Sequence, residues 1–165
     1  SASTGMAPPS SAAADPSRRS SQVPALAGPN TLTYAGVTVS GALGAEPRFL
    51  IGDETQQTAS IQVRDVVVGT GAVASARDRV TVDYTARGAR SKRTFDSSWL
   101  RGKPFSFVPS EIAFAAFSTG VPGMRVGGRR KLTIPSAMAY GSRGAGGVIK
   151  PNEPLVFVVD LLSVG

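Results

Sequence analysis

The stretch VTVDYTARG at residues 80–88 decides the fold of this chain. Its side chains alternate along an extended backbone, so that Val80, Val82 and Tyr84 share one face and polar residues share the other. Alternation of this kind, with β-branched and aromatic residues on the apolar face, is typical of a half-buried strand. The sequence therefore predicts a β-strand here. The neighbouring segments indicate which strands, helix and loops pack around it.

Outward from this strand, most of the second half of the chain carries extended patterns. The run at 155–162 is nearly continuous, apolar and rich in Val, which suits a central strand. The other predicted strands lie at 61–68 before the turn cluster at 69–71, at 105–107, and at 132–134. The residues that we expect in the core are Phe107, Leu132, Ile134, Leu155 and Val159.

A single segment favours a helix. Ser110 is suited to cap it, Glu111 suits its first turn, and residues 112–117 supply an apolar side before Gly120. Two long loops are predicted at 97–103 and 141–151. One sheet, one short helix and two exposed loops make an α+β domain.

The N-terminal part differs in composition from the rest of the chain. Residues 1–30 are rich in Ser, Ala and Pro and predict a flexible tether. In residues 31–60 an alternating Val37-Thr-Val39 and the apolar run 48–51 predict one or two extended segments. We expect this extension to add to the edge of a domain that spans residues 61–165.

The composition excludes several kinds of chemistry. The 165 residues include no Cys and no His, so disulfides, zinc-thiolate sites, and Ser-His-Asp or Cys-His catalysis are impossible. No apolar run approaches the roughly 18 residues that span a bilayer, so no transmembrane segment is expected. The net charge is +7, but the basic groups at 90–93 and 129–131 lack interleaved aromatic residues. This arrangement favours solvated basic strand ends and loops over a specific nucleic-acid site.

Taken together, four blocks of sequence resemble the motif series of the FKBP-type peptidyl-prolyl cis/trans isomerases. They are VTVDYTARG, TFDSSWLRGKPFSF, GVPGMRVGGRRKLTIPSAMAYG and LVFVVDLLSV, in the order of that family and at close to its spacings. The resemblance covers residues 61–165. It implies a curved antiparallel sheet wrapped around one short α-helix, with an apolar pocket between them that is rimmed by the two long loops. It also implies catalysis without a metal or cofactor.

The same resemblance implies the site residues. The residues expected to act in catalysis are Asp96, Tyr140, Tyr84 and Phe95. Those expected to bind the substrate are Arg101, Phe105, Phe114, Phe117, Val148, Ile149 and Phe157. Tyr140 would donate its hydroxyl to a substrate carbonyl, and Asp96 would lie beside the rotating amide with Arg101 as its partner.

Alternatives remain open for individual residues. Asp96 lies in Asp-Ser-Ser, which is good turn chemistry, so its carboxylate is also suited to bind backbone amides. Tyr84 is also suited to pack in the core with its hydroxyl satisfied. The chain departs from the usual family pattern, with Phe117 where Trp is common and Ala113-Phe114 where a Val-Ile pair is common. These departures bear on substrate preference and drug affinity.

The sequence leaves three functions in competition. The first is the isomerase, acting on proline-containing polypeptides and also binding macrolides such as tacrolimus or rapamycin. The second is a non-catalytic module or chaperone that uses the same pocket. The third is a basic surface-associating protein, whereas nucleotide binding is disfavoured because no phosphate-binding loop motif occurs. We expect a monomer.

The N-terminal region also suggests a location. The tether, the start at Ser1, the lack of Cys and the segment at 36–51 resemble exported FKBPs of high-GC Gram-positive bacteria. These features predict an extracytoplasmic protein, in the cell envelope or secreted. The chloroplast thylakoid lumen is the alternative.

Overall fold

The structure is a computed structural model that describes residues 28–52 and 59–165. It contains two antiparallel sheets, one with the order β1-β2-β3 and one with the order β4-β8-β9-β5-β6, in which β7 also pairs with β5. The predicted tether at 1–30 lies almost wholly outside the described residues. No helix in the described part of the chain is long and apolar enough to cross a membrane.

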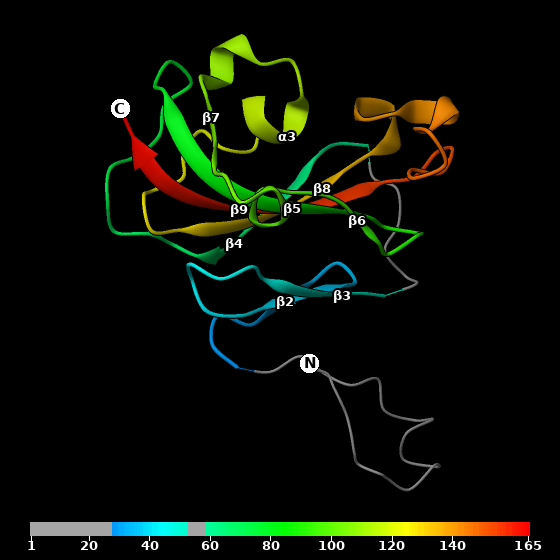
Figure 1. Ribbon diagram of the computed structural model, residues 1–165, viewed down its shortest axis with the longest axis horizontal. Coiled ribbons are helices and arrows are strands. Elements are labelled where there is room, and N and C mark those ends of the chain that lie inside the picture. Colours follow the sequence, from blue (N-terminus) through cyan, green and yellow to red (C-terminus); the bar gives the residue numbers. More distant parts are fainter. Residues whose placement is uncertain (1–27, 53–58) are drawn as a thin grey trace, which may run out of the picture.

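The larger sheet is built around β9 (Leu155–Val164). This strand pairs with β5 (Val80–Gly88) on one side and with β8 (Arg129–Ile134) on the other, as its apolar sequence predicts. The outer strands are β4 (Gln62–Val67), β6 (Thr94–Ser97) and β7 (Phe105–Phe107). The sheet curves around the short helix α3 (Ala115–Ser118), which lies against one face (Figure 1). The predicted α+β fold is confirmed.

The core lies between α3 and the sheet face that it covers. Val80, Val82 and Tyr84 all point into it, and each is at most 4% exposed. The five residues expected in the core are all buried. Because side chains alternate along a strand, the residues between these positions face the opposite side of the sheet.

The predicted helix is present but begins later than expected. Pro109–Glu111 forms a separate 3₁₀ turn, η1, and Ile112 is extended with φ −113°. The α-helix α3 begins only at Ala115, after Phe114, and its start has no side-chain cap. Ser110 is therefore not the cap of this helix, and the prediction of a continuous segment from Glu111 is wrong. Pro109 fixes the backbone for the first turn.

A second short helix lies in a segment predicted to be a loop. α2 spans Ser98–Arg101, and the Ser97 side chain accepts a hydrogen bond from the backbone N–H of Leu100. Gly102 ends the helix in the left-handed conformation with φ +70°. The second long loop contains the 3₁₀ turn η3 (Gly141–Arg143), which follows η2 (Ser136–Met138).

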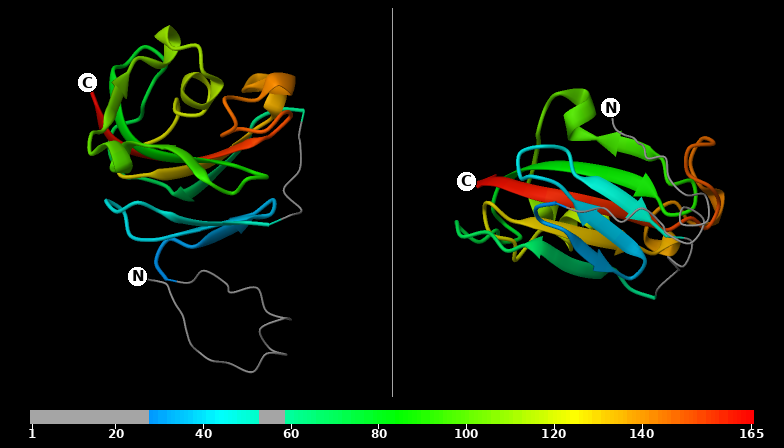
Figure 2. Two further views of the ribbon diagram at one scale, coloured as in Figure 1. Left: turned by 45° about the vertical axis from the view of Figure 1, so that its right-hand side comes forward. Right: turned by 90° about the horizontal axis from the view of Figure 1, so that it is seen from below.

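The N-terminal extension forms a sheet of its own. Its strands are β1 (Leu32–Tyr34), β2 (Val37–Ser40) and β3 (Arg48–Ile51). The sequence predicts that this extension adds to the edge of the larger sheet, and that prediction is wrong. The small sheet packs instead against the face opposite α3 (Figures 1 and 2). The buried apolar side chains between the two sheets are Val37, Val39, Phe49, Ile51, Ala89, Val156 and Val158. The extension thus supplies three strands, not one or two, and covers the face of the larger sheet that carries Val156 and Val158.

The position of this small sheet changes the environment of two cations on β8. Arg129 and Lys131 were predicted to be solvated, yet both are fully buried. They alternate with Leu132 and point away from the main core, into the layer beneath β1–β3. Arg129 is neutralised by Asp160 of β9, with Nε 2.6 Å from Oδ1 and Nη2 2.8 Å from Oδ2. The prediction of a solvated basic group at 129–131 is therefore wrong.

Candidate active site

Aromatic side chains from separate elements form one continuous group, here named the aromatic cluster. Its members are Tyr84, Phe95, Phe105, Phe107, Phe114, Phe117, Tyr140 and Phe157. Tyr84 is central, with its ring centroid 5.0 Å from that of Phe117 and 6.1 Å from those of Phe105 and Phe157. Several of the pairs meet edge to face, the geometry that the ring quadrupoles favour.

The cluster has a buried side and an accessible side. Tyr84, Phe117 and Phe157 are at most 6% exposed and belong to the core of the domain. Phe95, Phe105 and Phe114 are only partly buried. Tyr140, at the accessible side, is 43% exposed. The structure therefore presents aromatic surface to the solvent above a fixed aromatic floor.

Phe114 is brought into the cluster although it comes before α3 begins. Its ring lies 5.6 Å from Phe157 and 6.3 Å from Tyr140. It also lies 6.1 Å from Phe117, one helical turn further along the chain. Phe114 thus links the helix to the segment that carries Tyr140.

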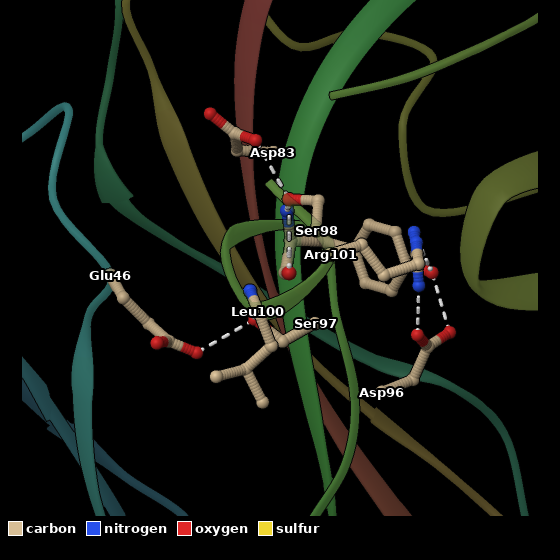
Figure 3. A network of polar contacts seen from close by, with 8 residues as sticks. Glu46, Asp83, Asp96, Ser97, Ser98, Leu100 and Arg101 are labelled. Carbon is tan, nitrogen blue, oxygen red and sulfur yellow. Dashed lines mark hydrogen bonds and ion pairs between the residues drawn. The ribbon is translucent and has the colours of Figure 1, made fainter. Parts of the chain in front are cut away.

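A polar group lies beside the aromatic cluster. The Tyr84 hydroxyl donates to Asp96 Oδ2 at 2.5 Å, and Arg101 Nη2 donates to the same hydroxyl at 3.0 Å. Arg101 Nη1 also forms an ion pair with Asp96 Oδ1 (Figure 3). The side chains of Asp96 and Arg101 remain 39% and 46% exposed. We call Tyr84, Asp96 and Arg101 the polar triad.

The geometry of the triad bears on the alternatives that the sequence leaves open for Asp96 and Tyr84. The hydrogen bonds described for the Asp96 carboxylate come from side chains of the triad, not from backbone amides. The ring of Tyr84 belongs to the core, and its hydroxyl belongs to the polar triad. Burial, followed by the hydrogen bond to Asp96, raises the pKa of Tyr84 to about 12. The hydroxyl therefore stays protonated in neutral solution and acts as the donor to Asp96.

The loop at 141–151 brings its two predicted residues to different environments. Ile149 is 4% exposed and packs in the core, whereas Val148 is 51% exposed. The backbone N–H groups of both donate to the carbonyl of Ala145, at 2.9 Å from Val148 and 3.0 Å from Ile149. The structure therefore separates this pair into a buried anchor and an exposed apolar side chain.

The sequence does not predict the role of Glu153, which links the loop at 141–151 to the turn at Arg90 and Ser91. Its carboxylate is buried and accepts three backbone hydrogen bonds, from Arg90 at 2.8 Å and from Ser91 and Lys150 at 2.6 Å. Burial alone would raise the pKa of Glu153, but these amide bonds outweigh it and the pKa is lowered. The residue lies just after the second loop in a segment without a recognisable motif, so no sequence signal pointed to it.

Fold and site together define a class of protein. A curved antiparallel sheet holds aromatic rings against one short helix, and a Tyr–Asp–Arg triad stands at the accessible side. This arrangement suits non-covalent binding of an apolar ring together with a polar group next to it. The chain contains neither His nor Cys, so the common nucleophilic pairs Ser–His and Cys–His are absent.

The chain belongs to the FKBP-type peptidyl-prolyl cis-trans isomerase family, whose model matches residues 71–162. It is 44% identical over 108 residues to the "FK506-binding protein" of Streptomyces anulatus, covering 64% of this chain and 87% of the relative. It is also 44% identical over 108 residues to the "39 kDa FK506-binding nuclear protein" of Drosophila melanogaster, covering 65% of this chain but only 30% of that longer protein. Among solved structures, it resembles a peptidyl-prolyl cis-trans isomerase of Pseudomonas syringae, with a TM-score of 0.54 and 34% identity. That match covers 64% of this chain and 75% of the other. The family predicted from the sequence is confirmed.

Proposed function

We propose that this peptidyl-prolyl cis-trans isomerase acts by holding the proline ring of an X-Pro peptide on the aromatic cluster while the preceding amide rotates beside the polar triad. The observation that carries this proposal is the direct contact between the two. Tyr84 belongs to both, because its buried ring touches Phe117 and its hydroxyl binds Asp96. An apolar ring and the polar amide next to it would therefore meet matching surfaces.

Rotation about a peptide bond needs no reactive side chain. Its barrier of about 18–20 kcal/mol arises because the planar amide loses resonance when it twists. A site lowers this barrier when it binds the twisted amide better than either planar form. The twisted amide has less charge separation than the planar forms. It therefore loses less hydration free energy when it leaves water. A millionfold acceleration requires only about 8 kcal/mol of such differential binding.

The residues have distinct roles in this proposal. The rings of Phe95, Phe105 and Phe157 exclude water from the rotating bond. Tyr140 is 43% exposed, and no hydrogen bond of its hydroxyl is described within residues 28–52 and 59–165. Its hydroxyl donates to a carbonyl of the bound chain. Asp96 orients and stabilises the twisted amide through its charge and forms no covalent bond.

The test is the rate of cis-to-trans conversion of a Leu-Pro or Phe-Pro tetrapeptide. The protein should accelerate it over buffer, and Asp96→Ala and Tyr140→Phe should each reduce kcat/KM by about tenfold, the loss of one charge-assisted or positioning hydrogen bond. Glu111→Ala, which removes an exposed carboxylate outside the cluster and the triad, is the matched control. Binding of the peptide without acceleration would instead support a non-catalytic module.

The same surface supports two finer proposals. Relatives are named as FK506-binding proteins, so a macrolide should compete with the peptide for the aromatic cluster. The departures around Phe114 and Phe117 should affect how tightly it binds. An extracytoplasmic location and assistance to the folding of exported chains are proposed from the N-terminal sequence alone, and fractionation of the native source tests the location.

A further inference from the structure

We propose that Glu46, on the loop between β2 and β3, is a positioning residue for the isomerase site and acts on Arg101 through Ser97 and α2. The inference rests on the proposed function of the polar triad. It assigns a role in activity to the N-terminal sheet, which lies on the far side of the larger sheet from α3 (Figure 1). The steps from one side to the other are hydrogen bonds between described residues.

The loop that carries Glu46 is held rigidly. Arg129 Nη1 donates to the Gly41 carbonyl at 2.9 Å, and Nη2 donates to those of Ala42 at 3.3 Å and Ala45 at 3.0 Å. The same guanidinium is fixed by its buried ion pair with Asp160. Arg129 is fully buried and is held by two hydrogen bonds to Asp160, so its guanidinium is fixed in place. The position of the loop is therefore set by β8. Glu46 follows Ala45 directly and inherits that position.

Glu46 reaches the first residue of the next step through one hydrogen bond. Its Oε2 accepts from the Ser97 hydroxyl at 2.8 Å (Figure 3). Ser97 is 2% exposed, and its Oγ in turn accepts from the backbone N–H of Leu100 at 3.3 Å. A serine hydroxyl has one proton. Because that proton goes to Glu46, the lone pairs of Oγ are turned toward the start of α2.

The helix that follows is too short to be stable alone. α2 has only four residues, and short helices are marginal without outside contacts. Its second anchor is Ser98, whose hydroxyl donates to Asp83 Oδ1 at 2.7 Å and accepts from the Tyr84 backbone N–H at 2.8 Å. The adjacent serines therefore bind α2 to two different surfaces. Ser98 sets its distance from β5, and Ser97 sets its orientation toward the N-terminal sheet.

The far end of α2 carries Arg101 into the polar triad. Its guanidinium contacts Asp96 and the Tyr84 hydroxyl, and its Cζ lies 5.3 Å from the centre of the Tyr84 ring. A planar guanidinium that meets two partners depends strongly on orientation. Loss of the Glu46 contact should therefore let α2 turn. The Arg101 guanidinium would then no longer contact Asp96 and the Tyr84 hydroxyl with good geometry at the same time.

The effect is measured by Glu46→Ala in the full chain, with peptide isomerisation and fluorescence as readouts. We expect kcat/KM to fall about fivefold, the factor that corresponds to one lost hydrogen bond. Ser97→Ala should have a similar effect, while Glu46→Gln keeps an accepting oxygen and should stay within about twofold of wild type. Glu111→Ala is the matched carboxylate control.

A second readout does not depend on activity. Trp99 is the single tryptophan of the chain and lies within α2, so its emission reports directly on that helix. Glu46→Ala and Ser97→Ala should shift this emission, and Glu46→Gln and Glu111→Ala should not. Together with the kinetics, the fluorescence distinguishes movement of α2 from a general loss of stability.

A double-mutant cycle tests the route through Arg101. In an Arg101→Ala background, Glu46→Ala should cause no further loss of kcat/KM, because its effect has no remaining path. Additive losses, or an unchanged Trp99 emission together with unchanged kcat/KM in Glu46→Ala, overturn the inference. An inactive wild-type protein would instead overturn the proposed function, and the Trp99 shift would still show whether Glu46 positions α2.

Discussion

Replacement of Lys131 by Met should change how the stability of the protein depends on pH. Lys131 is fully buried between the two sheets, where its Nζ donates to the Tyr34 carbonyl at 2.8 Å. Burial lowers the pKa of Lys131 from 10.5 to about 8, and the positive charge of Arg64 acts in the same direction. Because a tenfold change in an equilibrium constant is about 1.4 kcal/mol, the protonated lysine costs the folded state about 3 kcal/mol.

The direction of the pH dependence follows from proton binding in the two states. Between pH 8 and 10.5 the unfolded chain holds the Lys131 proton and the folded protein releases it. The free energy of unfolding of the wild type therefore rises with pH across this window. The cost is fully present below about pH 8 and is lost by about pH 10.5. Lys131→Met has no such group, so its stability relative to wild type should fall by about 3 kcal/mol across the same window.

Urea denaturation of both proteins at a series of pH values from about 7 to about 10.5 measures this difference. All other titrating groups are shared and cancel. Met also lacks the bond to Tyr34, but that loss is a constant offset and does not alter the slope. Lys103→Met, at an exposed lysine, is the matched control for the loss of one charge. A difference between wild type and Lys131→Met that stays constant with pH would refute the reasoning.

Three further substitutions test other parts of the structure. Tyr84→Phe removes the hydroxyl between Asp96 and Arg101 and should lower kcat/KM by about five- to tenfold with about 1 kcal/mol lost in stability, as measured by isomerisation and urea denaturation. Arg129→Met leaves the buried Asp160 carboxylate without its partner and should destabilise the protein by about 3–5 kcal/mol, much of which Asp160→Leu should restore in the double variant. Glu153→Gln places a donor against backbone N–H groups and should cost about 2 kcal/mol at neutral pH. The pKa of Glu153 is lowered in the folded state, so its contribution to the free energy of unfolding is present above about pH 4.5. That contribution is lost as the pH falls through the folded pKa. The Gln variant should therefore lack this loss of stability in acid denaturation.

Much of the larger sheet could be predicted from its sequence because its strands obey a simple rule. Val80, Val82 and Tyr84 alternate with polar residues, and one face of the sheet does bury them. The central place of β9 followed from its continuous apolar run. The aromatic members of the site were found through motifs, and the structure brings them together because β5, β9 and α3 converge on one core.

The helices were harder to predict because they are too short to show periodicity. A segment of four residues completes barely one turn, so the sequence pattern predicts α3 too long and predicts a loop in place of α2. Only local signals mark α2, namely the capping Ser97 and the left-handed Gly102. Both were present in the sequence, but each is common in loops as well.

The buried cations were mispredicted for a different reason. Alternation along β8 shows that Arg129 and Lys131 face away from Leu132, and charged residues on that face ordinarily lie in water. Whether a sheet face is wet depends on what packs against it, which is not encoded in the strand itself. Here the covering element is distant in sequence and begins with only weak strand patterns.

The small sheet is bound to the larger one in a way that makes the two interdependent. The family match spans residues 71–162 and does not include β1–β3, yet those strands bury Val156 and Val158 of the central strand. The same extension supplies the Gly41 carbonyl to Arg129 and the Tyr34 carbonyl to Lys131, two cations that it removes from water. Such charges are stable in a buried layer only when their partners are in place. The cations of β8 therefore favour one register of the N-terminal sheet over others, and that specific register is what brings Glu46 to Ser97.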